Sequence, residues 1–91
     1  MAYNTVTITT TATLIIAANT NRIGLILVNT SAGTVYLADN NSVTTSNGIP
    51  LRENENLTED SGGTKMFPGD IYGIVGSGTA DVRYWERTRQ S

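Results

Sequence analysis

The chain has 91 residues, with six basic and eight acidic side chains, a formal net charge of −2, and neither cysteine nor histidine. Disulfides and the usual zinc, haem-thiolate and iron–sulfur ligands are therefore excluded, and the charge offers no basic surface for nucleic acid. A domain of this size buries only about 60–65% of the surface that its unfolded chain exposes. We therefore expect self-association to supply additional stability.

No apolar run approaches the roughly 20 residues needed to cross a bilayer, and the first residues lack the basic start of a signal peptide. We expect a protein that is made in a cytoplasm and contacts no membrane. The residue types also indicate no cofactor.

Residues 1–20 predict an extended N-terminal segment and the first strands. Val6 and Ile8 alternate with threonine, which is the period of a β-strand with one apolar and one polar face. Two alternatives remain for this polar start: an ordinary edge strand, or an arm that reaches a neighbouring subunit.

Residues 23–28 form an apolar run between Arg22 and Asn29, and they predict a central strand with both faces covered. Covering both faces takes a second sheet on one side, and other parts of the chain or another subunit on the other side. We expect residues 23–38 to form an antiparallel hairpin. Further along, Pro50 indicates a strand away from the centre of a sheet.

Residues 52–64 predict a solvated loop, which serves as an exposed tip or as a contact to a neighbour. Catalytic carboxylates would need an apolar pocket that raises the pKa of one of them, and Leu57 is the only apolar residue in this stretch. We therefore predict no catalytic residue and no metal ligand. The stretch contains four of the eight acids: Glu53, Glu55, Glu59 and Asp60.

Residues 71–86 predict a second hairpin that turns at Gly-Ser-Gly. In its last strand Arg83 and Trp85 share one face. Trp85 either stacks on a sugar or a partner, or covers an edge of the core. In the tail, Arg87 and Arg89 either meet an acidic neighbour or lie on a frayed end.

Short strands separated by turn signals, without a helical stripe, predict an all-β fold. We expect a single small β-sandwich or jelly-roll-like barrel of about seven or eight short antiparallel strands. The sandwich core is predicted over residues 21–86, after the N-terminal segment of residues 1–20 and before the tail of residues 87–91.

Five stretches carry a resemblance: NRIGLILVN at 21–29, TVYL at 34–37, NGIPL at 47–51, GDIYGI at 69–74 and GTADVRYWE at 78–86. Over about residues 21–86 the chain resembles small all-β virion structural proteins of tailed bacteriophages. It departs from their pattern at residues 52–64, where a short loop containing Pro-Gly is expected.

The resemblance implies a non-enzymatic capsid decoration (cement) protein, made in the bacterial host and located on the virion head. It implies a homotrimer that bridges subunits of the major capsid protein. The alternative is a tail or head-fibre component that binds a host-surface glycan or receptor, with Trp85, Tyr84 or Tyr36 as stacking platforms. The candidate interface residues are Tyr3, Val6, Ile8, Arg83, Trp85, Arg87 and Arg89.

Overall fold

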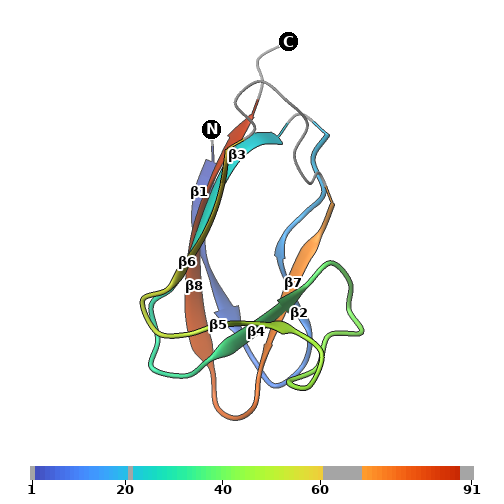
Figure 1. Cartoon of the computed structure of the whole chain (residues 1–91), viewed down its shortest axis with the longest axis vertical. Helices are drawn as coiled ribbons and strands as arrows, with labels where there is room; N and C mark the ends of the chain where they lie inside the picture. Colours follow the sequence, from blue (N-terminus) through green and yellow to red (C-terminus); the bar gives the residue numbers. More distant parts are fainter. Residues whose placement is uncertain (1, 21, 61–68, 89–91) are drawn as a thin grey trace.

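The computed structural model describes residues 2–20, 22–60 and 69–88, which form two four-stranded antiparallel sheets packed face to face (Figure 1). The strand order is β1-β8-β3-β6 in the first sheet and β2-β7-β4-β5 in the second. The predicted all-β sandwich is confirmed. The strands are β1 Ala2–Ile8, β2 Thr13–Ile16, β3 Arg22–Asn29, β4 Val35–Ala38, β5 Ile49–Leu51, β6 Asn56–Asp60, β7 Ile71–Val75 and β8 Ala80–Thr88.

The strand pairing has the connectivity of a jelly roll. Strand β1 pairs with β8, β2 with β7, β3 with β6 and β4 with β5, as in one long antiparallel ribbon doubled back between β4 and β5. The ribbon then rolls up, so that β3 also pairs with β8 and β4 with β7. Eight strands in this double-sheet arrangement are the jelly-roll form of the β-sandwich.

Both predicted hairpins are wrong. Strands β3 and β4 lie in different sheets, and so do β7 and β8. The turns between them carry the chain across the sandwich, because a local turn signal does not specify which sheet receives the next strand. The prediction of a loop over residues 52–64 is also wrong in part, since Asn56–Asp60 forms β6 and pairs along β3.

The edge-strand alternative for the N-terminal segment is confirmed. Strand β1 lies at the edge of the first sheet and pairs along its whole length with β8. Residues 2–8 therefore do not form a free arm. Pro50 lies in β5, at the edge of the second sheet, as predicted.

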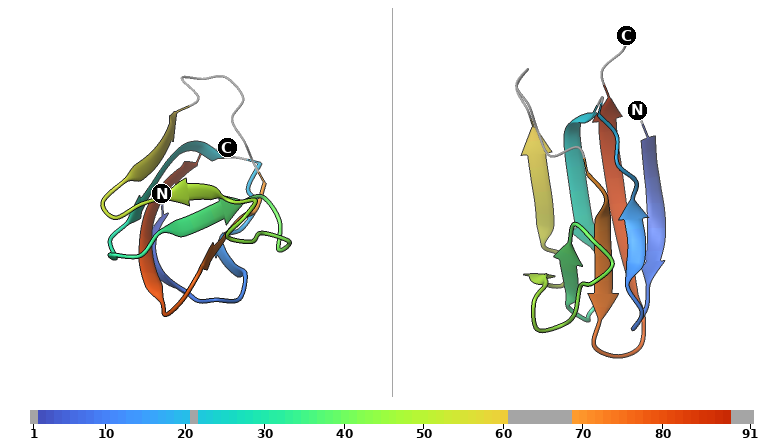
Figure 2. Two further views of the ribbon diagram at one scale, coloured as in Figure 1. Left: turned by 60° about the horizontal axis from the view of Figure 1, so that its bottom comes forward. Right: turned by 90° about the vertical axis from the view of Figure 1, so that its right-hand side faces the viewer.

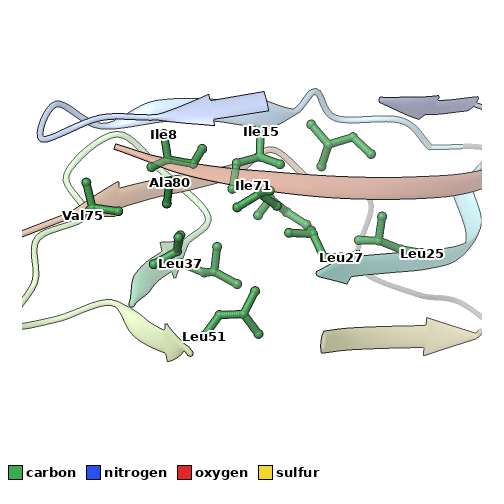
Figure 3. Close-up of a cluster of buried hydrophobic side chains, with 12 residues drawn as sticks. Ile8, Ile15, Leu25, Leu27, Leu37, Leu51, Ile71, Val75 and Ala80 are labelled. Atoms are coloured by element: carbon green, nitrogen blue, oxygen red, sulfur yellow. The ribbon is translucent and has the colours of Figure 1, made fainter. Parts of the chain in front are cut away.

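The core lies between the sheets and consists of aliphatic side chains (Figure 3). A register shift between Leu14 and Ile16 allows both Ile15 and Ile16 to be buried on the inward side of β2. The core side chains are Ile8, Ile15, Ile16, Leu25, Leu27, Val35, Leu37, Leu51, Ile71, Val75, Ala80 and Val82.

A buried ion pair links β3 to its neighbour β8 at one end of β3, and its arginine also bonds to the other side of the sandwich. A register shift between Arg22 and Gly24 turns the Arg22 side chain inward, where its Nε donates to Oε2 of Glu86 at 2.7 Å. Its Nη1 donates to the Gly69 carbonyl at 3.1 Å, and its Nη2 donates to the Ala17 carbonyl at 2.8 Å. Arg22 thus connects β3 and β8 to the segments that flank β7 and β2.

A neutral polar cluster occupies the opposite end of β3. Asn29 is fully buried, and its Nδ2 donates to the carbonyls of Gly33 at 2.7 Å and Leu51 at 2.9 Å. Its Oδ1 accepts from the Ser31 N–H at 2.9 Å. Asn29 therefore holds the turn after β3 and the end of β5 together. In the sequence, Arg22 and Asn29 stand out only as the polar ends of the strand.

Candidate interaction surface

The described part of the chain contains no group of three acidic, histidine or cysteine side chains that could hold a metal ion, and no helix that could span a membrane. Glu53 and Glu55 of the acidic stretch are both exposed, and Glu55 pairs with Arg52 at 3.8 Å. The side chains of Glu59 and Asp60 lie outside the described residues. The unusual features of the described surface are apolar.

The outward face of the first sheet carries exposed apolar side chains on its two interior strands. Trp85 of β8 is 44% exposed, and Ile26 of β3, directly opposite it in register, is 38% exposed. In the neighbouring register row, Arg83 lies between Thr5 of β1 and Val28 of β3. We call these five residues the Trp85 face; together with Asn4 and Tyr84 they line a shallow hollow.

Strand β3 is central, as predicted, because it lies between β8 and β6 (Figure 2). Its inward residues Leu25 and Leu27 are buried, whereas Val28 is only half-buried on the outward side. Within the described residues the inward face of β3 is covered and the outward face is not, so the prediction that both faces are covered holds for the inward face only. The outward side is the part of the strand that a partner can reach.

The alternation of β8 explains how Trp85 reaches this surface. Ala80, Val82 and Glu86 are buried on the inward side, while Arg83 and Trp85 are exposed on the other. The prediction that Arg83 and Trp85 share a face is confirmed. Because Trp85 points away from the core, it does not cover a core edge.

One of the candidate interface residues, Ile8, is wrong, because it is fully buried in the core. Val6 is half-buried and packs against the core from the same side of β1, so only part of it can reach a partner. The Tyr3 side chain and Arg89 lie outside the described residues. Ile26 and Val28 are not among the predicted interface residues, although the alternation within residues 23–28 allows one half of that run to face outward.

Arg87 also projects from the outward side of β8, next to β3. Its Nε lies 2.9 Å from the position that a Cβ would take at Gly24. The absence of a side chain at Gly24 therefore gives the guanidinium room to lie across β3. Arg83, Trp85 and Arg87 are the candidate residues that the structure brings together on one face.

No family model, curated protein or solved structure matches this chain. The jelly-roll fold does not select a function, since sandwiches of this kind serve many unrelated roles. The functional argument therefore depends on the surfaces of the molecule and on the residues that form them.

A second apolar feature is a groove of about 560 Å³ between β5 and β6, the edge strands of the two sheets. Its volume is within the range of small-molecule sites. Leu25, Leu37, Leu51 and Ile71 of the core line it, and Ile49 and Leu57 form exposed parts of its lining. The polar residues around it, Asp39, Asn47, Glu55 and Asn56, are all exposed, so none is a buried group that would orient a ligand.

Proposed function

We propose that the chain is a non-enzymatic capsid decoration (cement) protein of a tailed bacteriophage. It assembles as a homotrimer on the head surface and bridges subunits of the major capsid protein. The observation that supports this function is the Trp85 face, where a tryptophan and an isoleucine are exposed in the middle of a sheet. The resemblance of residues 21–86 to small virion proteins supplies the biological context, and jelly rolls are common among capsid proteins.

The Trp85 face has the composition of a docking surface. An antiparallel sheet that faces water usually presents polar residues outward, but Trp85 and Ile26 interrupt that pattern on adjacent interior strands. Covering the exposed part of Trp85 removes about 100 Å² from water, which corresponds to about 2–3 kcal/mol. Tryptophan and arginine are the residue types that most often dominate binding energy in protein interfaces.

The charges on this face indicate the chemistry of the partner. Arg83 belongs to it and Arg87 projects from the same side of β8, in a chain whose net charge is −2. Asp81 also lies on this side, and its Oδ1 accepts from the Thr7 hydroxyl at 3.3 Å. A complementary capsid surface would present carboxylates or carbonyl oxygens around an apolar patch. Many copies bound side by side on a head would gain avidity that a single copy lacks.

The test is binding to purified phage heads that lack this protein, measured as copies pelleted per head. We expect saturable binding, with a copy number that follows the number of capsomers. Trp85→Ser should lower the affinity at least tenfold, because it removes the central apolar contact. Leu57→Ser is the matched control, since Leu57 is 37% exposed but lies at the groove. Absence of saturable binding by the unmodified chain would reject the capsid function.

One observation favours a second candidate function. The shallow hollow places the Trp85 indole beside the polar residues Asn4, Thr5 and Arg83, an arrangement that also suits a sugar. The chain would then be a tail or head-fibre component that binds a host-surface glycan. Tyr36 belongs to the other sheet, so Trp85 is the platform here. A glycan hit that Trp85→Ser abolishes, without any binding to heads, would favour this alternative.

A further inference from the structure

We propose that the outward face of the second sheet is the surface through which copies of this chain contact one another. This inference rests on the self-association in the proposed function and identifies the surface that mediates it. The face consists of Leu14 on β2, Tyr72 and Ile74 on β7, Tyr36 on β4 and Pro50 on β5. We call these five residues the tyrosine face.

The residues of the tyrosine face form two adjacent rows across the sheet. Leu14 lies opposite Tyr72, and Ile74 lies opposite Tyr36, which in turn lies opposite Pro50. Leu14 is 42% exposed, Pro50 is exposed, and the other three are half-buried. Each of the four strands therefore contributes an apolar or tyrosine side chain to this face.

The sequences of the interior strands are typical of strands that are covered on both sides. Strand β7 reads IYGIV and β4 reads VYLA, without a charged residue in either. Their inward side chains fill the core, and their outward side chains are apolar or tyrosine. The first sheet differs, because its outward face includes Asp81, Arg83 and Arg87.

The chain already packs an apolar side chain on one corner of this face. Val43, in the connection between β4 and β5, is buried but does not belong to the core between the sheets. A Cβ added at Gly48 would lie 2.6 Å from Cβ of Tyr36 and 3.0 Å from Cγ2 of Val43. This connection therefore folds against the Tyr36 corner, whereas Leu14 keeps its large exposure in the described structure.

A second copy of the chain is the occupant that best fits this chemistry. An uncharged face meets itself without burying charge, whereas self-contact of the first sheet would take the charged groups of Asp81, Arg83 and Arg87 out of water. Apolar sheet faces pack about 10 Å apart with interdigitated side chains. In a two-fold pair the tyrosine face meets itself. In a trimer, the part of the tyrosine face near β2 in one copy meets the part near β5 in the next copy.

The size of the face predicts how strong the contact is. Four strands about 4.8 Å apart, with four or five residues of about 3.3 Å each, give a projected footprint of about 300 Å². A standard interface removes about 800 Å² from each partner. We therefore expect reversible self-association in solution, which becomes more complete when binding to a scaffold holds the copies side by side.

Sedimentation of the full chain over protein concentrations from about 1 μM to 1 mM tests the proposal. The average mass should rise above the 9.7 kDa of one chain as the concentration increases. Leu14→Glu should weaken association at least tenfold, because it buries a carboxylate at the contact. Ile26→Glu, at a residue with similar exposure on the other sheet, should associate like the unmodified chain.

Circular dichroism and thermal melting establish that each variant is folded, and Leu14→Thr is the milder substitution if Leu14→Glu does not fold. The proposal is overturned if the unmodified chain is monomeric throughout, or if both Leu14 variants associate normally. The measurement uses no heads. If the unmodified chain self-associates but does not bind heads, the capsid role is rejected and the contact through the tyrosine face is retained. If it binds heads but does not self-associate, the tyrosine-face contact is rejected and the capsid role is retained.

Discussion

The two faces of strands β3 and β8 differ in how completely the chain itself covers their apolar side chains and pairs their polar groups. On the inward face, Arg22 and Glu86 pair with each other, and Leu27 is fully covered by the core. On the outward face, Ile26 and Trp85 lie opposite each other and remain exposed. Substitutions one residue apart should therefore affect different properties, namely folding stability on the inward side and binding on the outward side.

The largest expected effect is that of Arg22→Ala on the inward face. This change leaves the Glu86 carboxylate buried without its partner and removes the donors to two carbonyls, so it should lower the free energy of unfolding by about 3–5 kcal/mol. Urea denaturation measures the loss. Arg52→Ala is the matched control, because the side chains of Arg52 and Glu55 are 68% and 46% exposed. It should change the stability by less than about 1 kcal/mol.

The neighbouring residues Leu27 and Ile26 provide the most direct test of the difference between the two faces. Leu27→Ala should cost about 2–5 kcal/mol, because Leu27 is fully buried and its removal leaves a cavity. Ile26→Ala should cost less than about 1 kcal/mol, because 38% of Ile26 is already in contact with water. Both unfolding free energies should be measured at low protein concentration. Equal losses would contradict the assignment of the two faces.

A smaller loss is expected from Asn29→Ala, at the far end of β3. The carbonyls of Gly33 and Leu51 lose their side-chain donor, so the free energy of unfolding should fall by about 1–3 kcal/mol. Asn40→Ala is the control, because Asn40 is exposed and its Oδ1 accepts from the Ser42 N–H only locally. If the two substitutions had the same effect on thermal unfolding, Asn29 would not be the structural anchor that its contacts indicate.

Several features of the fold follow from local sequence patterns. The alternation in residues 80–86 predicts that Arg83 and Trp85 share a face, and Pro50 predicts a strand away from the centre of its sheet. These predictions succeed because the two-residue period of a strand and the missing N–H of proline act over a few residues. The all-β class follows from the same patterns repeated along the chain.

The partner of each strand was decided only by the tertiary structure. The polar, acidic sequence of β6 predicts a loop, yet its pairing with β3 makes it a strand. The segments predicted as two hairpins instead connect strands of different sheets. The register shift after Arg22 directs its side chain inward, where it forms a buried ion pair with Glu86. Strand pairing and burial depend on backbone hydrogen bonds and packing between residues that are distant in sequence. Local patterns set the conformation of a segment, but they do not specify which other segment will cover it.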